Sequence, residues 1–472
     1  MNRPAFPWLL ALAFFFLRLP LLFWYRGEYT DSVLLLTLFE NQSTYYPPLF
    51  PLCAWIPRSI GLDATLAGRL VSLLSTALCS VPLFHLGRRL RGPRTALTAV
   101  LLFQSAALAN QWAPRAMSDA LFTLLFITCL YYCVLCYDNA SPARDFARLV
   151  FWTGMASLCR YQGLAFLPVL LLLAWRRRLR PVCSTHMGAL LPWLALAAWI
   201  AWRGFGHGAQ YAERTLDWQA TLHAYWIMTW GFLRWLPYAM GYLNVLLALF
   251  GLWALRRTQH SLILLGVYLV VIWFVAHVPF QSFQFRYFLP ILPLVVLLAS
   301  VGWANMYERS ATRFHSIIIV ALMVWLGVSS AFSAQVLRDQ RDAWGDLWQA
   351  AAYLRTLPPG ARVYANELYA NRVENYKLRF WSGREVKPLY TSWEALEAGD
   401  VVVLSSLHDD ITAAMRRLAQ RWDTSEQRTF TVTLIPRLGD LMSSPPRLTS
   451  TPQAMAYRNA PQRFTTIVVS LR

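Results

Sequence analysis

The stretch AGRLVSLLSTALCSVPLFHLGRRLRGPRTALTAVLLFQSAALANQWAPRAMSDALFTLLF (residues 67–126) holds most of three apolar runs. These runs lie near 66–86, 96–112 and 119–137. Each has about the length that an α-helix needs to cross a bilayer. The arginine-rich loop RRLRGPR separates the first two runs, whereas Asp119 begins the third. The stretch therefore predicts membrane helices whose basic and acidic ends alternate between two sides.

The composition indicates that most of the chain, and not only 67–126, forms membrane helices. The protein has 472 residues, of which 57% are hydrophobic and only 14% are charged. Soluble domains carry about 25% charged residues, and the mean hydropathy is +0.38. From about residue 334 the long apolar runs stop and the chain becomes mixed. We therefore expect a polytopic α-helical membrane domain at 1–333 and a C-terminal extracytoplasmic α/β domain at 334–472.

The apolar runs predict about eleven transmembrane helices. They lie near 7–25, 66–86, 96–112, 119–137, 148–159, 162–175, 187–204, 235–255, 261–279, 287–304 and 315–333. The fifth and sixth runs are short, which leaves open whether they cross fully or form one re-entrant hairpin.

The charge distribution predicts the orientation. The formal net charge is +19, and most of the excess lies among the apolar runs rather than in 334–472. Alternate loops collect the arginines, which predicts a cytoplasmic N-terminus and a C-terminal domain on the outer side. Arginine far outnumbers lysine, which favours a bacterial protein. The basic residues are expected to face lipid phosphates, and no nucleic-acid partner is expected.

The first outer loop contains two acids. RGEYTDSVLLL (26–36) places Glu28 and Asp31 where the chain leaves the bilayer. There they avoid the cost of an ion in hydrocarbon, at least ~2.5–3.5 kcal/mol. The apolar spacing of 31–42 predicts a helix that lies in the interface. The prolines of YYPPLFP (45–51) predict a stiff, non-helical loop.

A second outer loop, HGAQYAERTLDWQATLHAYW (207–226), carries His207, Glu213, Asp217 and His223. Together with Glu28, these side chains are candidates to bind the acceptor or a divalent metal ion. Their spacing matches no compact metal motif, and a polar interfacial helix explains them as well.

The C-terminal region predicts alternating helices and strands. Residues 344–357 and 409–422 have helical spacing, and the second segment has acids at its start and arginines later, as the helix dipole favours. ARVYAN (361–366), DVVVLSS (400–406) and FTVTLI (430–435) have the composition of strands.

The order of these features resembles the GT-C superfamily of membrane glycosyltransferases. The resemblance rests on the exposed acid after the first run, on YPPLFP, on 67–126, on GMASLCRYQGLAFLPVLLLLAWRRR (154–178) and on FRYFLPILPLVVLLAS (285–300). It covers roughly 5–335. The nearest group is that of the bacterial protein O-mannosyltransferases and lipid A aminoarabinose transferases.

The resemblance implies a periplasmic active site, a polyprenyl-phosphate sugar donor and an extracytoplasmic acceptor, which is a protein, a lipid or a glycan. It maps the first-loop acid of the family onto Asp31 and the second-loop acid onto Asp119. Members commonly carry a further acid directly after the first one. Here that position is Ser32, which counts against a paired-acid or metal role.

Inverting transfer from a lipid phosphate requires a base, cations that stabilise the departing phosphate and an apolar groove for the lipid. One carboxylate suffices as the base, and we assign it to Asp31, although Asp31 is also a good helix N-cap. Asp119 is the second catalytic candidate. Arg286, Arg160 and Arg115 are the candidates for phosphate binding, because a guanidinium can donate two parallel hydrogen bonds.

Other functions remain open at this stage. A glycan ligase would use a polyprenyl pyrophosphate donor. A transporter would need ionisable groups in the middle of the bilayer, and few are present. A non-catalytic subunit of a cell-envelope glycan pathway is the third alternative.

Overall fold

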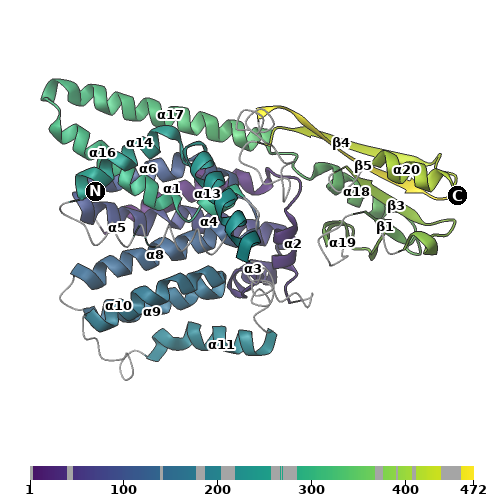
Figure 1. Cartoon of the computed structure of the whole chain (residues 1–472), viewed down its shortest axis with the longest axis horizontal. Helices are drawn as coiled ribbons and strands as arrows, with labels where there is room; N and C mark the ends of the chain where they lie inside the picture. Colours follow the sequence, from purple (N-terminus) through teal and green to yellow (C-terminus); the bar gives the residue numbers. More distant parts are fainter. Residues whose placement is uncertain are drawn as a thin grey trace. The chain divides into compact units, whose positions relative to one another are not determined.

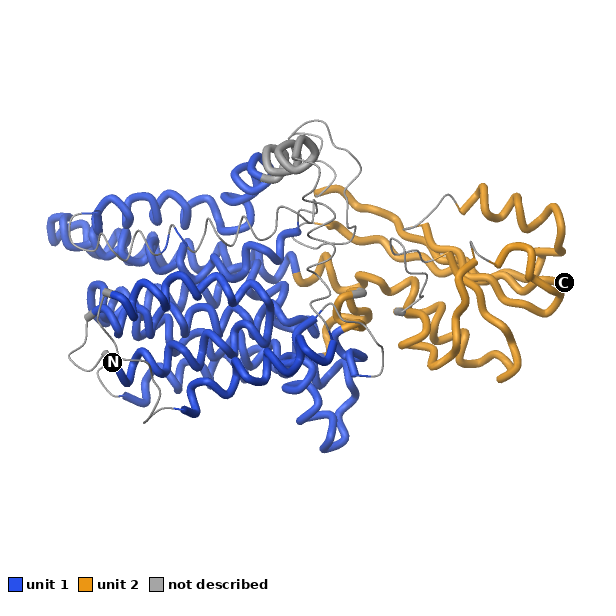
Figure 2. Tube along the Cα trace, turned by 60° about the horizontal axis from the view of Figure 1, so that its bottom comes forward, with its two compact units in different colours: residues 1–22, 35–336 blue, residues 23–34, 337–472 orange. Residues whose placement is uncertain are grey.

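The structure is a computed structural model that separates the chain into two compact units (Figures 1 and 2). Unit 1 comprises residues 1–22 and 35–336, and unit 2 comprises residues 23–34 and 337–472. The structure describes residues 4–39, 46–138, 142–176, 187–203, 218–256, 266, 268, 284–366, 376–389, 392–406, 411–436 and 459–472. The membrane span predicted near 261–279 lies almost wholly outside them.

Unit 1 is helical. Its elements, some of which extend into unit 2, are α1 (Phe6–Arg18), η1 (Leu19–Phe23), α2 (Thr30–Leu36), α3 (Leu49–Ser59), α4 (Ala64–Leu78), α5 (Ser80–Arg91), α6 (Pro93–Ser105), α7 (Ala107–Trp112), α8 (Ser118–Asp138), α9 (Pro142–Cys159), η2 (Tyr161–Phe166), α10 (Leu167–Arg176), η3 (Met187–Leu190), α11 (Leu191–Arg203), α13 (Trp218–Met240), α14 (Tyr242–Leu255), η5 (Phe285–Phe288), α16 (Leu292–Arg309), η6 (Thr312–Phe314) and α17 (His315–Asp339).

Several of these helices have the length and apolar character of membrane spans. Within the described residues they are Phe6–Phe23, Ala64–Arg91, Ser118–Tyr137 and Thr312–Asp339. The pair Thr229–Met240 and Tyr242–Leu255 also qualifies, but it is bent by 103°. A helical membrane protein is thus confirmed, whereas the number of about eleven spans stays a prediction.

Two sequence-based expectations about helix continuity were wrong. The run near 235–255 is broken at Gly241, whose φ of +86° interrupts the helix. Conversely, α3 begins at Leu49 and includes Pro51, although 45–51 was expected to be a non-helical loop. Proline is tolerated in the first turn of a helix, because the amide hydrogens there have no partner within the helix.

Glycines allow α14 and α16 to pack closely against each other. A Cβ added at Gly302 would lie 2.3 Å from the Leu247 carbonyl oxygen, and one at Gly251 would lie 2.0 Å from the Leu298 carbonyl oxygen. Small residues at a membrane helix crossing permit this backbone contact. The crossing therefore depends on the absence of side chains at both positions.

A buried arginine joins α1 to the break between α6 and α7. Arg18 donates to the Asn110 side-chain oxygen at 2.8 Å and to the Gln104 backbone oxygen at 2.6 Å. Its third bond reaches the Gln104 side-chain oxygen at 2.5 Å. Asn110 in turn donates to the Ser333 hydroxyl at 2.8 Å. Arg18 thus caps the Gln104 carbonyl in the last turn of α6, as cationic side chains do at helix C-termini.

Unit 2 is built on a five-stranded mixed sheet in the order β2-β1-β3-β5-β4. Strand β1 pairs in parallel with β2 and β3, whereas β5 pairs antiparallel with β3 and β4. The elements are α18 (Gly345–Thr356), β1 (Val363–Ala365), α19 (Tyr376–Ser382), β2 (Val386–Pro388), η7 (Trp393–Ala395), β3 (Val401–Ser405), α20 (Ile411–Ala419), β4 (Gln427–Leu434) and β5 (Gln462–Ser470).

Side chains from β1, β3, α20 and β5 contribute to the core of unit 2. Tyr364, Val402, Leu418 and Val469 are buried together. The predicted helices at 344–357 and 409–422 and the three predicted strands are present, whereas β2 and β5 were not predicted. The alternation of apolar residues in QRFTTIVVS (462–470) would have indicated β5.

We expect Gly302→Ala to destabilise the protein. The added methyl group has no room at the α14–α16 crossing, and overpacking typically costs about 1–3 kcal/mol. Thermal unfolding of the purified protein in detergent measures the effect as a lower Tm.

Gly327→Ala in α17 is the matched control, because a Cβ there meets no atom within 4 Å. Alanine stabilises helix interiors by up to ~1 kcal/mol relative to glycine, so this variant should equal or exceed the wild-type Tm. Equal Tm values for the two variants would contradict the proposed close contact.

Candidate active site

The turn between α7 and α8 is the centre of the candidate site in unit 1. Ser72 of α4 holds it, because the Ser72 hydroxyl donates to the Met117 carbonyl oxygen at 3.0 Å and accepts from the Met117 amide at 3.3 Å. Gly68 lies one turn earlier on α4, and a Cβ there would lie 2.8 Å from the Ala116 Cβ. The turn is therefore fixed against α4.

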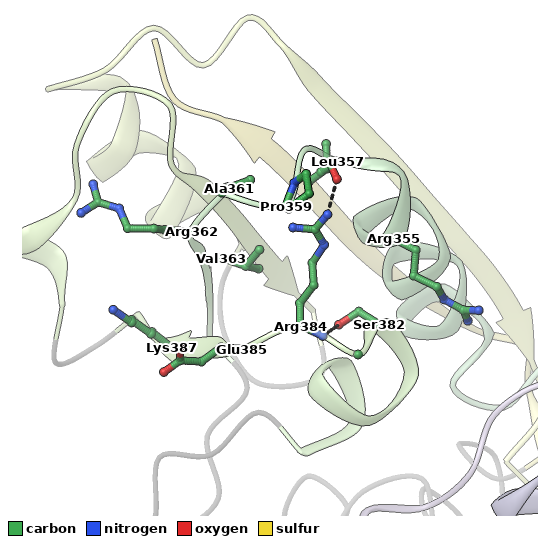
Figure 3. A pocket seen from close by; sticks show the side chains of 12 residues that line it. Arg355, Leu357, Pro359, Ala361, Arg362, Val363, Ser382, Arg384, Glu385 and Lys387 are labelled. Atoms are coloured by element: carbon green, nitrogen blue, oxygen red, sulfur yellow. Dashed lines mark hydrogen bonds between the residues drawn. The ribbon is translucent and has the colours of Figure 1, made fainter.

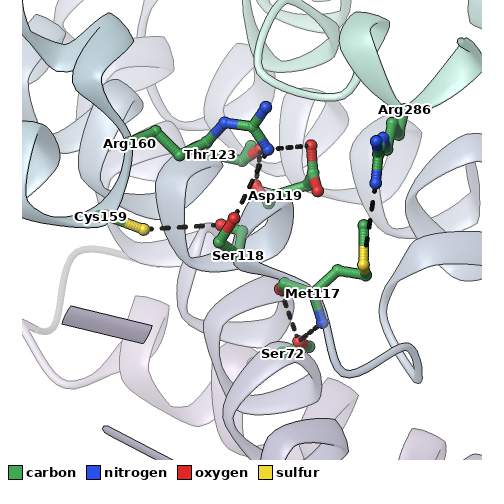
Figure 4. A network of polar contacts seen from close by, with 8 residues as sticks. All are labelled: Ser72, Met117, Ser118, Asp119, Thr123, Cys159, Arg160 and Arg286. Carbon is green, nitrogen blue, oxygen red and sulfur yellow. Dashed lines mark hydrogen bonds and ion pairs between the residues drawn. The ribbon is translucent and has the colours of Figure 1, made fainter. Parts of the chain in front are cut away.

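Asp119, in the first turn of α8, forms a buried ion pair with Arg160 (Figure 4). A guanidinium nitrogen of Arg160 donates to the Asp119 Oδ1 at 2.7 Å and approaches the Ser118 hydroxyl at 3.5 Å. Asp119 is fully buried, whereas the Arg160 side chain retains 15% exposure. The Asp119 Oδ2 is buried and has no hydrogen-bond partner among the described residues.

Gly163 explains the position of Arg160. Arg160 has an extended backbone between α9 and η2, and the Gly163 amide donates to its carbonyl oxygen at 2.8 Å. A Cβ at Gly163 would lie 2.4 Å from the Ser157 backbone nitrogen. Only glycine allows η2 to fold back this closely on α9.

Arg286 approaches the same turn from another part of the chain. It lies in η5, is 7% exposed, and donates to the Met117 sulfur at 3.8 Å (Figure 4). Arg115 lies within the turn itself and is fully buried. The structure thus gathers Arg115, Arg160, Arg286 and Asp119, all of which were candidates from the sequence, around residues 115–119.

Residues 23–34, which include the start of the first predicted outer loop, belong to unit 2. Asp31 is the second residue of α2 and is partly exposed. It is therefore not the N-cap that the sequence suggested, because the first helical bond runs from the Val33 amide to the Tyr29 carbonyl oxygen at 3.2 Å. Glu28 is buried and accepts a hydrogen bond from the Ser32 hydroxyl at 3.2 Å.

The side chains of the candidate residues in the second predicted outer loop, 207–226, are not described in the structure. His207, Glu213 and Asp217 lie outside the described residues, and His223 lies in α13 at a position whose side chain is not described. No group of three His, Cys, Asp or Glu side chains gathers for a metal ion within the described parts of the chain. A metal role for these four residues stays a prediction.

Two cavities were not predicted from the sequence. In unit 1, a groove of about 780 Å³ is lined by Leu36, Phe39, Leu52, Trp55, Arg58 and Ser59. In unit 2, a cavity of about 620 Å³ has a basic lining (Figure 3). Two of its arginines already have protein partners, since Arg384 donates to the Pro358 carbonyl oxygen at 2.9 Å and Arg362 pairs with Asp400 at 2.7 Å.

Comparison with known proteins gives a family match over part of the chain and a similar fold. Residues 46–202 match the family described as dolichyl-phosphate-mannose-protein mannosyltransferase. No curated protein sequence matches the chain.

The fold matches that of ArnT from Cupriavidus metallidurans. The apo structure is 14% identical with a TM-score of 0.58, and the match covers 89% of this chain and 96% of that chain. The structure bound to undecaprenyl phosphate is 15% identical with a TM-score of 0.58, over 88% and 94% of the two chains.

A more distant match is the archaeal oligosaccharyltransferase AglB from Archaeoglobus fulgidus, whose structure contains an inhibitory peptide and a dolichol-phosphate. It is 8% identical with a TM-score of 0.43, and the match covers 82% of this chain and 65% of that chain.

The family match lies in the membrane unit, and the ArnT match covers most of the chain. The resemblance to the GT-C superfamily of membrane glycosyltransferases, and within it to the group of protein O-mannosyltransferases and lipid A aminoarabinose transferases, is therefore confirmed, and the chain has the GT-C fold.

Proposed function

We propose that the protein transfers a sugar from a polyprenyl-phosphate donor to an extracytoplasmic acceptor, with inversion at the sugar carbon. The observation that carries this proposal is the cluster around residues 115–119, where Arg160 pairs with the buried carboxylate of Asp119 and Arg286 contacts the neighbouring Met117. A buried cation beside an unsatisfied carboxylate oxygen in an apolar helical unit is a feature typical of functional sites. The ArnT structure with bound undecaprenyl phosphate supports the donor class.

The arginines supply the phosphate-binding half of the reaction. Arg286, Arg160 and Arg115 are proposed to bind the donor phosphate and to stabilise the negative charge that it gains on leaving. A guanidinium donates two parallel hydrogen bonds to phosphate oxygens, and its charge acts strongly where water is excluded. Asp119 orients Arg160, and its Oδ2 is available for a sugar hydroxyl.

Asp31 supplies the other half as the general base that removes the acceptor proton. The acceptor oxygen attacks the sugar carbon while the carbon–phosphate-oxygen bond breaks, so one carboxylate completes the proton transfer. The phosphate leaves as an anion and requires no separate acid. Among the described residues no metal-ligand set is present, and no step of the proposal uses a metal ion.

The apolar groove of unit 1 is the proposed site for the isoprenoid chain. Phe39, Leu52 and Trp55 line it and are 44%, 48% and 59% exposed. Arg58 lies at the same groove, where its charge would face lipid headgroups while its stem packs on apolar surface. An apolar wall beside a cation suits a polyprenyl phosphate.

The remaining parts of the proposal concern location. We place the protein in the bacterial inner membrane, with its N-terminus in the cytoplasm and its C-terminal domain in the periplasm. Membrane lipids surround unit 1, whose helix α17 exposes Ile317, Val320 and Val324. The acceptor is a protein, a lipid or a glycan of the cell envelope.

A glycan ligase is the second candidate, because three arginines around one turn also suit a pyrophosphate. Purified protein supplied with radiolabelled polyprenyl-phosphate sugars, and in parallel with polyprenyl-pyrophosphate glycans, separates the two. The proposal expects label transfer to cell-envelope acceptors from the monophosphate donor alone. Transfer from the pyrophosphate donor alone would establish the ligase, and transfer from neither would refute both.

We expect Asp31→Asn to abolish most turnover while leaving the fold intact. Asparagine preserves size and polarity but cannot accept the proton, and loss of a general base typically costs about 10²–10⁴-fold in rate. Initial rates with the labelled donor measure the loss.

Asp63→Asn is the matched control. Asp63 is a true N-cap that accepts from the Thr65 and Leu66 amides of α4, and asparagine caps a helix as well as aspartate does. This control should keep wild-type activity. Wild-type turnover in Asp31→Asn would refute the assignment of the base.

We expect Arg286→Lys to weaken donor binding about tenfold and Arg286→Ala to weaken it further. Lysine keeps the charge but loses the planar pair of donors, and a hydrogen bond to a charged group contributes about 1.5–3 kcal/mol. The KM for the labelled donor reports the change.

Arg94→Ala provides the control for Arg286, because Arg94 packs over the Tyr307 ring at 5.2 Å at the start of α6, in a stretch predicted to be cytoplasmic. Its donor KM should match that of the wild type. An unchanged KM in Arg286→Ala would remove this residue from the phosphate site.

Replacing either partner of the Asp119–Arg160 pair by leucine should lower the Tm strongly, since breaking a buried pair costs about 3–5 kcal/mol. The double variant should recover much of that stability, because no uncompensated charge remains. Activity should stay lost in all three proteins. Recovery of activity together with Tm in the double variant would show that the pair is only structural.

A further inference from the structure

Residues 23–34 fold as part of the C-terminal unit rather than of the membrane unit. Two hydrogen bonds to backbone oxygens connect them to the start of residues 337–472. The Trp24 indole nitrogen donates to the Leu337 carbonyl oxygen at 2.8 Å, and the Arg26 amide donates to the Arg341 carbonyl oxygen at 3.3 Å. The loop that carries Asp31 is therefore attached to a segment more than 300 positions away.

The exposed ion pair between residues 23–34 and 337–472 contributes little to holding these two segments together. Arg26 pairs with Asp342 at 3.1 Å, but their side chains are 47% and 38% exposed. Solvent-exposed ion pairs contribute little. The buried contacts, which follow along the chain, must provide the specific fit.

Trp344 is the centre of those buried contacts and has an unusual backbone. Its φ of +63° makes it the one non-glycine residue with positive φ in the described parts of the chain. A bulky residue in this region is strained, and the surrounding structure must enforce the conformation. Trp344 directly precedes α18, and its carbonyl oxygen accepts a hydrogen bond from the Trp348 amide at 3.0 Å.

A buried lysine enforces the position of the Trp344 ring. The Lys377 ammonium lies 3.1 Å from the centre of the ring, and Lys377 is fully buried. A cation over an indole face is attracted strongly when water is excluded. Asp346, at the start of α18, is also buried and accepts from the Thr466 hydroxyl of β5 at 2.8 Å. Burial raises the pKa of Asp346, while Thr466 and the Lys377 charge oppose that rise.

On its other side, Trp344 contacts the first outer loop. A Cβ added at Gly27 would lie 2.8 Å from the Trp344 Cβ and 2.9 Å from the Ala343 carbonyl oxygen. The Tyr29 ring meets the Trp344 ring edge-on, with centroids 6.1 Å apart. Trp344 thus requires glycine at position 27 and holds the ring of Tyr29.

Tyr29 links the Trp344 contact to the backbone around Asp31. The Tyr29 carbonyl oxygen accepts the Val33 amide at 3.2 Å, which is the first hydrogen bond of α2. Asp31 lies inside that hydrogen-bonded turn. A displacement of Tyr29 would therefore move the backbone that positions the Asp31 carboxylate.

We propose that Trp344 is a positioning residue for the transfer reaction: it contacts Gly27 and Tyr29 and thereby fixes the start of α2, which carries Asp31. The proposal rests on the role of Asp31 in the proposed function. It assigns the C-terminal domain a part in catalysis that needs no contact between Trp344 and substrate. Misplacement of a catalytic group by about 1 Å can cost about 100-fold in rate.

Hydrogen exchange of the full-length protein in nanodiscs, read by mass spectrometry on peptides covering 24–34, tests the attachment. Trp344→Gly retains access to positive φ and removes the whole side chain, and Gly27→Ala introduces the clash. Both should accelerate exchange in this peptide, while peptides from β3 and β5 stay protected and show that unit 2 is folded. Trp344→Phe keeps a ring and should give intermediate exchange.

Arg417→Ala is the matched control, because Arg417 lies over the Trp393 ring at 4.3 Å elsewhere in unit 2. It should leave the exchange of 24–34 and the activity unchanged. Initial-rate assays on the same proteins should show kcat reduced about 10–100-fold in Trp344→Gly, with a donor KM within twofold of wild type, and partial rescue in Trp344→Phe.

The possible results distinguish failure of the positioning role of Trp344 from failure of the proposed function. Unchanged exchange in both Trp344→Gly and Gly27→Ala overturns the inference whatever the enzyme does. Accelerated exchange with unchanged kcat also overturns it, because the loop would then need no positioning. Failure of the proposed function is seen independently, as wild-type turnover in Asp31→Asn.

Discussion

A charge inside an apolar helical unit must find its partners within the protein. Water is absent from the hydrocarbon region, so an ion that lacks a partner there raises the free energy of the folded state. Unit 1 meets this requirement in two ways. Arg18 pairs with no acid among the described residues and instead donates to carbonyl and amide oxygens at the break after α6. Arg160 is paired with the carboxylate of Asp119.

These two solutions have different consequences. Around Arg18 the hydrogen bonds join α1, α6 and α17, and the network is closed by Ser333. Around Asp119 the network is incomplete, because Oδ2 is buried and has no hydrogen-bond partner among the described residues. A satisfied network stabilises a fold, whereas an unsatisfied buried acceptor indicates a place for a ligand. The difference separates the structural arginine from the proposed catalytic cluster.

Sequence reasoning predicted the parts of the site better than their arrangement. Asp119, Arg160 and Arg286 were predicted at the outer ends of apolar runs, because run length and arginine-rich loops reveal sidedness. Their association around residues 115–119 was not predictable, since 41 positions separate Asp119 from Arg160 and the contact depends on the rotation of α8 and α9. The need for glycine at position 163 could not be predicted for the same reason, because it arises from close packing against Ser157 of the preceding helix α9.

In unit 2 the order of the strands in the sheet could not be predicted, because paired strands lie far apart in the sequence. Strand β5 lies between β3 and β4 in the sheet but follows both in the chain, so no local pattern indicates its neighbours. Serine at position 32 is a similar case. By sequence it is only a departure from the acid of the family, whereas in the structure its hydroxyl donates to the buried carboxylate of Glu28.

The position of β5 also has a consequence for biosynthesis. Strands β3 and β4 leave the ribosome before the strand that joins them, and residues 23–34 must wait for partners that follow the whole membrane unit. Loop closure over such a distance is slow relative to local helix formation. A nascent chain would thus insert its helices before residues 23–34 could find their partners. Under the proposed function, transfer could begin only after the downstream sheet had folded.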